Sequence, residues 1–177
     1  AVYLYDRIAG SYGTAVNFGT GSDNTYSVAF GDVDGDGDLD LAVGNYNQQN
    51  AVYLYDSIAG TYGTAVNFGT GTDGTYSVAF GDVDGDGDLD LATGNSGEQN
   101  AVYLYDSVAG TYGTAVNFGT GTDSTYSVAF GDVDGDGDLD LAVGNNNGQN
   151  AVYLNDGAGN YDITAVNFGT GTDSTYS

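Results

Sequence analysis

The chain has 177 residues, of which 25 are acidic and one, Arg7, is basic, giving a formal net charge of −24. This length suffices for one domain with a hydrophobic core. The lack of basic side chains argues against phosphate recognition, so neither nucleic acid nor an anionic membrane surface is expected as a partner. Cysteine is absent, which excludes disulfides, and no apolar run is long enough to insert into a membrane.

A repeat with a period of 50 residues organises the chain. The segment AVYLYD begins at residues 1, 51 and 101, and AVYLND begins at residue 151. Differences between the copies concentrate in the stretch before each AVYL and in the turn that follows it, which is typical of surface loops. Near-identical copies of this length predict that one supersecondary unit is repeated and that its copies stack on one another.

Each repeat contains four segments with the pattern of short β-strands, separated by clusters of Gly, Asn and Asp. In the first complete repeat these segments are residues 27–32, 39–44, 51–55 and 64–68. Neither side of the segments is cleanly polar, which indicates sheets covered on both faces. The first two segments carry small residues that suit the crowded inner part of such a sheet: Ala29, Gly31, Ala42 and Gly44. No segment keeps a helical period.

Four strands in each repeat of this length predict an all-β chain, a β-propeller with four-stranded blades. We expect a single repeat domain over residues 1–177, with a half-blade at 1–26 and blades at 27–76, 77–126 and 127–177. Three blades and a half do not close a ring, because closed propellers typically have about four to eight. We therefore expect either assembly with copies of the chain, as a homo-oligomer or filament, or a longer array of repeats. A β-solenoid of stacked hairpins is the alternative fold.

The run DVDGDGDLD occurs three times, at residues 32–40, 82–90 and 132–140, with no basic side chain nearby. Two unit charges ~5 Å apart in an effective dielectric of about 20 repel by roughly 3 kcal/mol. We therefore expect each run to bind a cation. Oxygen ligands without Cys or His select a hard ion, so Ca²⁺ is the first candidate. Mg²⁺ is disfavoured because it requires octahedral geometry and keeps its waters.

Alternate carboxylates of one run can converge on a single ion. In the first run these are Asp32, Asp34 and Asp36, and Gly37 permits the sharp turn that follows them. The carbonyl of Asp38 can add a ligand, and Asp40 can close the sphere from the start of the next strand. The predicted metal residues are Asp32, Asp34, Asp36, Asp38, Asp40, Asp82, Asp84, Asp86, Asp88, Asp90, Asp132, Asp134, Asp136, Asp138 and Asp140.

Two alternatives compete with this interpretation of the acidic runs. An EF-hand also opens with D-x-D-x-D-G, but it requires Glu at position 12 and a helix on either side. Position 12 is Val43, Thr93 or Val143 here, and the flanks are strand-like, so we reject the EF-hand. The other alternative is an Asp-rich turn that binds no metal, which three identical copies disfavour.

The segment VAFGDVDGDGDLDLAVGN resembles the FG-GAP/VCBS repeat, the blade unit of integrin-α-type propellers and of related extracellular proteins. Phe30 and Gly31 match the FG of that family. Gly44 and Asn45 stand where integrin-type repeats have Gly-Ala-Pro, so the chain lies closer to the VCBS side. VYLNDGAGNY at 152–161 is similar to the strand and turn that follow in such blades. The resemblance implies a Ca²⁺-binding hairpin between the first two strands of each blade, and a secreted or cell-surface protein.

Enzymatic activity is not expected, because the chain has no His, Cys or Lys to serve as general base or nucleophile. We expect an extracellular module stabilised by three Ca²⁺ ions, with a structural, adhesion or recognition role. Its candidate partners are further copies of itself, carbohydrate or an extracellular protein. The alternative is a lectin with sugars in the grooves between blades. The tyrosines concerned, which could instead pack between blades, are Tyr53, Tyr55, Tyr62 and Tyr76.

Overall fold

The computed structural model describes residues 1–161, 164–172 and 174–176, and every regular element in these residues is a β-strand. The first four-stranded antiparallel sheet consists of β3 (Thr25–Gly31), β4 (Asp40–Asn45), β5 (Asn50–Asp56) and β6 (Thr61–Phe68). Each of the four segments predicted in this repeat overlaps one of these strands, and the ends differ by at most three residues; Asp32 and Leu39, predicted as strand ends, lie in the loop between β3 and β4.

Two further sheets repeat this arrangement. The second contains β7 (Thr75–Gly81), β8 (Asp90–Asn95), β9 (Asn100–Tyr103) and β12 (Val116–Phe118). The third contains β13 (Ser124–Gly131), β14 (Asp140–Asn146), β15 (Asn150–Tyr153) and β16 (Val166–Phe168). Two hairpins form separate pairs: β1 (Val2–Asp6) with β2 (Ser11–Val16), and β10 (Tyr105–Asp106) with β11 (Thr111–Tyr112). By sequence, β1 and β2 correspond to the two outer strands of a blade, β5 and β6.

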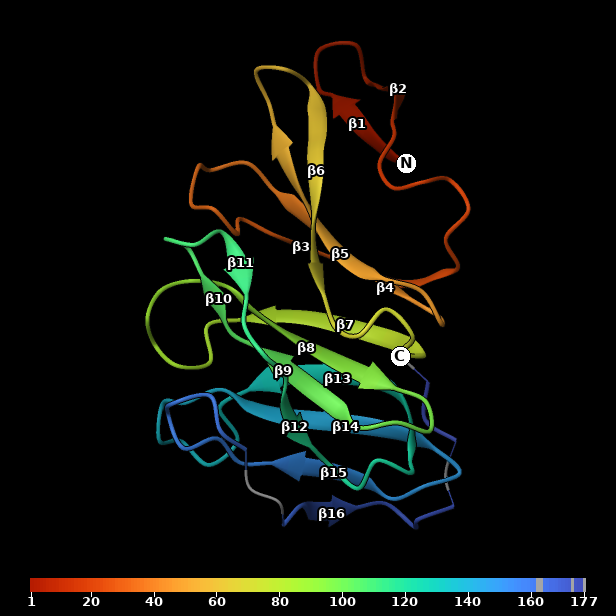
Figure 1. Ribbon diagram of the computed structural model, residues 1–177, viewed down its shortest axis with the longest axis vertical. Helices are drawn as coiled ribbons and strands as arrows, with labels where there is room; N and C mark the ends of the chain where they lie inside the picture. The colour runs from red at the N-terminus through yellow and green to blue at the C-terminus, as the bar shows by residue number, and fades with distance from the viewer. Residues whose placement is uncertain (162–163, 173, 177) are drawn as a thin grey trace.

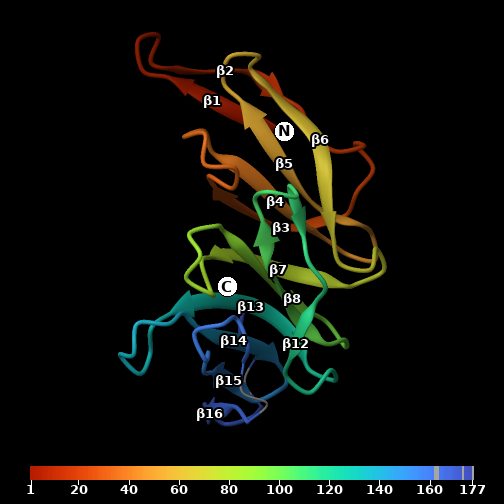
Figure 2. The ribbon, with the colours of Figure 1, turned by 60° about the vertical axis from the view of Figure 1, so that its left-hand side comes forward.

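The sheets follow one another along the long axis of the molecule, with the β1–β2 hairpin at one end and β16 at the other (Figures 1 and 2). The first strand of the second sheet, β7, packs between β3 and β13, the first strands of its neighbours. Each sheet is thus a blade, and the first strands form the inner edge of the stack. The described blades do not close into a ring, so the fold is an incomplete β-propeller rather than the β-solenoid considered as an alternative.

The hydrophobic core lies between blades rather than within them. Every residue of β4 and β8 is buried, which confirms that neighbours cover both faces of a blade. Phe68 of the first blade packs against Tyr103 and Tyr112 of the second, with ring centroids 5.5 and 5.7 Å away. Phe118 repeats this contact with Tyr153 and Tyr161 of the third blade, at 5.3 and 5.8 Å. We call this cluster, one Phe on two Tyr of the following repeat, the aromatic joint.

Buried polar side chains also connect neighbouring blades. Asn50 Nδ2 donates to Thr75 Oγ1 over 2.8 Å, and that hydroxyl donates to Asn95 Oδ1 over 2.9 Å. Asn100, Thr125 and Asn145 form the same chain of bonds between the second and third blades. Since buried polar groups are costly without partners, these bonds fix how each blade sits on the next.

The glycines at the ends of β3 and β7, Gly31 and Gly81, receive side chains of the following blade. A Cβ on Gly81 would lie 2.9 Å from Phe130 Cδ2 and 3.0 Å from Leu139 Cδ1, whereas one on Gly131 would have no atom within 4 Å. The two glycines share their local sequence and differ in whether a complete blade follows. The small residues predicted for the inner part of the blade are therefore needed for close packing between blades.

We expect Gly81→Ala to lower the free energy of unfolding by about 1–3 kcal/mol, because the added methyl overpacks the contact with Phe130. Gly131→Ala is the matched control and should change stability by less than about 0.5 kcal/mol. Urea unfolding followed by circular dichroism measures both variants. Equal losses in the two variants would contradict this account of blade packing.

Candidate metal centres

The acidic runs form the loops that join the first and second strands of each blade. In the first blade, Gly31 of β3 pairs with Asp40 of β4, and residues 32–39 make the turn between them. Gly37 has a φ of 93°, a left-handed conformation that a residue with a Cβ rarely adopts. Corresponding loops join β7 to β8 and β13 to β14. This is the position that the family resemblance implied.

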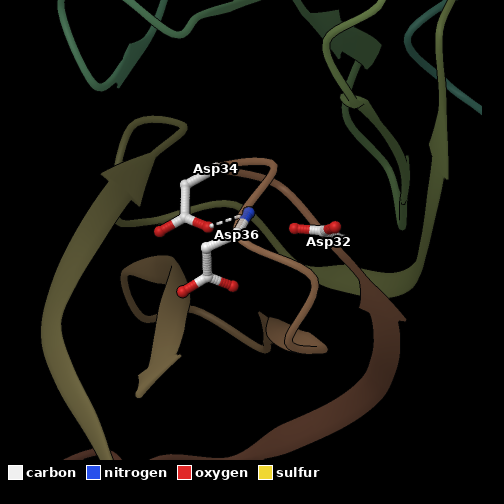
Figure 3. A group of neighbouring side chains, drawn as sticks. All are labelled: Asp32, Asp34 and Asp36. Atoms are coloured by element: carbon white, nitrogen blue, oxygen red, sulfur yellow. Dashed lines mark hydrogen bonds between the residues drawn. The ribbon is translucent and has the colours of Figure 1, made fainter. Parts of the chain in front are cut away.

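Three carboxyl groups gather around each turn. One oxygen from each of Asp32, Asp34 and Asp36 lies within 4.8 Å of the others (Figure 3). The other two loops hold the same arrangement at Asp82, Asp84 and Asp86 and at Asp132, Asp134 and Asp136. The structure thus brings together nine of the predicted metal residues as three groups of three.

Backbone amides hold the first of these groups in place. Gly37 N donates to Asp32 Oδ2 over 3.1 Å, Asp36 N donates to Asp34 Oδ1 over 3.3 Å, and Asp38 N donates to Asp36 Oδ1 over 2.8 Å. The other oxygen of Asp32, Oδ1, is buried and has no hydrogen-bond partner among the described residues. A buried carboxylate oxygen without a donor is costly, and a cation between the three side chains would satisfy it.

The ninth residue of each run is placed differently. Asp40 is buried, and it accepts bonds of 2.8 Å from Val33 N at Oδ2 and from Tyr55 N at Oδ1. Asp90 accepts from Val83 N and Tyr105 N, and Asp140 accepts from Val133 N and Asn155 N. This carboxylate therefore ties the start of the acidic loop to the outer part of the same blade, at Tyr55 of β5, at Tyr105 of β10 and at Asn155 just after β15.

The seventh residue also connects the loop to the outer part of the blade. Asp38 Oδ2 accepts from Ser57 N over 2.9 Å, and Asp88 Oδ2 accepts from Ser107 N over 3.1 Å. The positions of Asp38 and Asp40 stand apart from the three-carboxylate groups. Metal coordination by these two residues stays a prediction. The same holds for their equivalents in the other loops, Asp88, Asp90, Asp138 and Asp140.

The donor set fits a hard divalent cation. Three converging carboxylates offer only oxygen ligands. Carbonyl oxygens and water are the further ligands that Ca²⁺ commonly takes. Asp32, Asp34 and Asp36 would hold the ion in the first loop, and their equivalents would hold it in the others. A bound ion would offset the repulsion between the carboxylates, so its main effect would be on folding and loop geometry.

Burial and mutual repulsion raise several carboxyl pKa values. Burial raises the pKa of Asp90 to about 6, although the amides of Val83 and Tyr105 lower it. The pKa of Asp40 is raised for the same reason. Burial also raises the pKa of Asp84, with smaller contributions from Asp86 and Asp82. Without a bound cation, these three carboxyl groups therefore bind protons more tightly in the folded protein than in the unfolded chain.

We expect the metal-free protein to become more stable as pH falls from about 7.5 to 5, because these folded-state pKa values lie above the unfolded value of about 3.9. The melting temperature in a chelator should rise by a few degrees over this range. In millimolar Ca²⁺ the trend should reverse, because protons then compete with the ion.

Asp90→Asn keeps an oxygen acceptor and removes the titrating group, so it should flatten the metal-free pH dependence. A melting temperature of the metal-free wild-type protein that falls steadily with pH would contradict the expected sign. Differential scanning calorimetry in both buffers measures these trends.

The tyrosines considered for sugar binding pack against other rings in the structure. Tyr53 lies 5.5 Å from Phe18, Tyr62 lies 5.0 Å from Tyr55, and Tyr76 lies 4.4 Å from Tyr126, measured between ring centroids. Tyr76 belongs to a row along the inner edge that also includes Tyr26, Tyr126 and Tyr176. The spacing of 50 residues could have revealed this row. Carbohydrate binding stays a prediction.

Comparisons with known proteins support the same repeat unit. A family model described as an FG-GAP-like repeat matches residues 32–93, 82–143 and 132–177. No curated protein matches the chain. Among solved structures, the chain is similar to one titled "Crystal structure of BBS1N in complex with ARL6DN, soaked with lead", with a TM-score of 0.41 and 10% sequence identity. That match covers 82% of this chain and 57% of the solved one, so the chain spans little more than half of its length. None of the described residues forms a helix able to cross a membrane.

Proposed function

Because the chain belongs to the FG-GAP-like repeat family, we propose that it is a Ca²⁺-stabilised propeller module with an adhesion or recognition role outside the cell. The observation that carries the proposal is the convergence of three carboxylates in every loop, with the buried Asp32 Oδ1 left without a donor. A cation in the first loop would supply that missing partner, and a cation in any of the three loops would offset the repulsion between its carboxylates.

The role proposed for the ion is structural. Each acidic loop is bonded to the outer part of its own blade through Asp40 or its equivalent, so ordering the loop also orders the blade. The chain contains no His, Cys or Lys to perform general acid–base or nucleophilic chemistry. A non-enzymatic module agrees with the family, whose repeats are a structural kind of domain.

The proposed extracellular location rests on the family of the repeat and on the availability of Ca²⁺ outside the cell. FG-GAP repeats are typical of extracellular or surface proteins. Extracellular Ca²⁺ modules work at dissociation constants of about 10⁻⁴–10⁻³ M, where the ion is abundant. A formal charge of −24 also favours cation binding and keeps the protein soluble.

Removal of Ca²⁺ should lower the melting temperature, and its return should restore it. At a hundredfold excess over the dissociation constant, each site should contribute about 2.7 kcal/mol. Each kcal/mol should shift the melting temperature of a chain of this size by about 2–4 °C. Calorimetry of the chelator-treated and reloaded protein measures the effect. An unchanged melting curve in chelator would refute the proposal, and equal rescue by Mg²⁺ would refute the choice of ion.

Single substitutions should remove one site at a time. Asp36→Ala, Asp86→Ala and Asp136→Ala should each reduce the number of bound Ca²⁺ by one, because each removes one member of a separate group. Isothermal titration calorimetry measures the stoichiometry. Asp56→Asn is the control, since Asp56 lies outside the loops and accepts bonds from the amides of Ile58 and Ala59. Loss of all three sites in one variant, or of none, would contradict independent centres.

A further inference from the structure

The aromatic joint occurs three times within the chain, each time with the Phe at the end of one repeat and the two Tyr in the next. Phe18 packs on Tyr53 and Tyr62, with centroid distances of 5.5 and 5.8 Å. Phe68 and Phe118 make the same contact one and two repeats later. The joint therefore does not depend on one local environment, because it forms wherever one outer hairpin follows another.

The two halves of a fourth joint are left open at opposite ends of the molecule. Phe168, the fourth residue of the Phe series, is 48% exposed, whereas Phe68 and Phe118 are 4% and 1% exposed. Tyr3 and Tyr12, the first members of the two Tyr series, are 58% and 68% exposed. Figures 1 and 2 show that the two ends are far apart, because β16 and the β1–β2 hairpin lie at opposite ends of the stack.

The Tyr half is already assembled for such a contact. Tyr5 and Tyr12 of the β1–β2 hairpin pack edge-to-face with centroids 5.2 Å apart. Their equivalents inside the chain, Tyr55 with Tyr62 and Tyr105 with Tyr112, lie 5.0 and 4.9 Å apart. The strand pairing of β1 with β2 also carries the same irregularity, after Tyr3, that β5 and β6 carry after Tyr53. The exposed hairpin thus has the same strand pairing and the same ring packing as its counterparts inside the chain.

The Phe half is arranged in the same way. Asn150 Nδ2 donates to Thr175 Oγ1 over 2.9 Å, as Asn50 and Asn100 donate to Thr75 and Thr125 between complete blades. Tyr176 stacks on Tyr126 with centroids 5.4 Å apart. The third blade therefore already holds the first residues of a following inner strand, and its outer half, with Val166 and Phe168, remains uncovered.

We propose that two copies of this chain associate head-to-tail, with Phe168 of one copy seated on Tyr3 and Tyr12 of the next. The contact would repeat a ring packing that the chain uses three times internally, with the β1–β2 hairpin in place of the outer hairpin of a complete blade. It is heterologous, because it joins different surfaces of the two copies, and it can therefore extend to larger rings or chains. Both copies are strongly acidic, so association should require salt or Ca²⁺ to screen their repulsion.

Sedimentation of the full chain in millimolar Ca²⁺ and about 0.15 M salt tests the proposal. The wild-type protein should associate as its concentration rises. Phe168→Ser and Tyr12→Ser should each weaken association at least about tenfold, because each truncates an aromatic anchor of the contact. Val108→Ser is the matched control: Val108 is also exposed, but it belongs to the β10–β11 hairpin in the middle of the stack (Figure 1), so its substitution should leave association unchanged.

Mixing the two end variants gives a sharper test of the geometry. Phe168→Ser keeps an intact Tyr half and Tyr12→Ser keeps an intact Phe half, so an equimolar mixture should form a complex of two chains and nothing larger. Both replaced side chains are exposed, and unchanged melting curves would verify folding. The proposal is overturned if the wild-type protein stays monomeric at hundreds of micromolar, if both variants associate like wild type, or if the mixture remains monomeric. None of these outcomes bears on Ca²⁺ binding by the loops.

Discussion

No blade of this protein has a hydrophobic core of its own, and the rest of the structure follows from this constraint. Leu91 in the second blade is buried in a cluster that combines side chains of the first and second blades, and Phe68 of the first blade packs on Tyr103 of the second. Apolar area is removed from water in the joints between sheets, where most of the stabilisation must therefore arise. The Asn50–Thr75–Asn95 bonds align the joint, and glycine at position 81 lets the sheets approach closely.

The acidic loops combine two tasks in one short run. The first three carboxylates converge on a common point and repel one another, whereas the last is buried and bonded to amides of its own loop and of the third strand. Asp40 thus holds the loop in place whether or not a cation is present. The arrangement keeps the ligands close together at an electrostatic cost that a divalent ion offsets.

The sequence predicts much of this architecture because alternation and the 50-residue period are local signals. The strands, the incomplete propeller and the grouping of Asp32, Asp34 and Asp36 all follow from them. The bond from Tyr55 N to Asp40 could not be predicted, because it depends on an irregularity in the third strand. Leu39 was expected to begin a strand, but it lies in the loop and is exposed, since no complete blade covers that face. Contacts between blades therefore decide which side chains are buried and where a strand begins, at positions where the local sequence pattern does not.

One pair of contacts distinguishes repeats that are otherwise almost interchangeable. Tyr46 of the first blade lies over Gly74, where a Cβ would meet its ring at 3.2 Å, whereas the equivalent Ser96 bonds to Ser124 through its hydroxyl. A large side chain faces glycine where the first blade meets the second, and two small hydroxyl groups face each other where the second blade meets the third. During refolding, a blade that docked one repeat out of order would meet the wrong partner at this point. The variable loops thus make the contacts between successive blades different from one another, where the identical strands would make them alike.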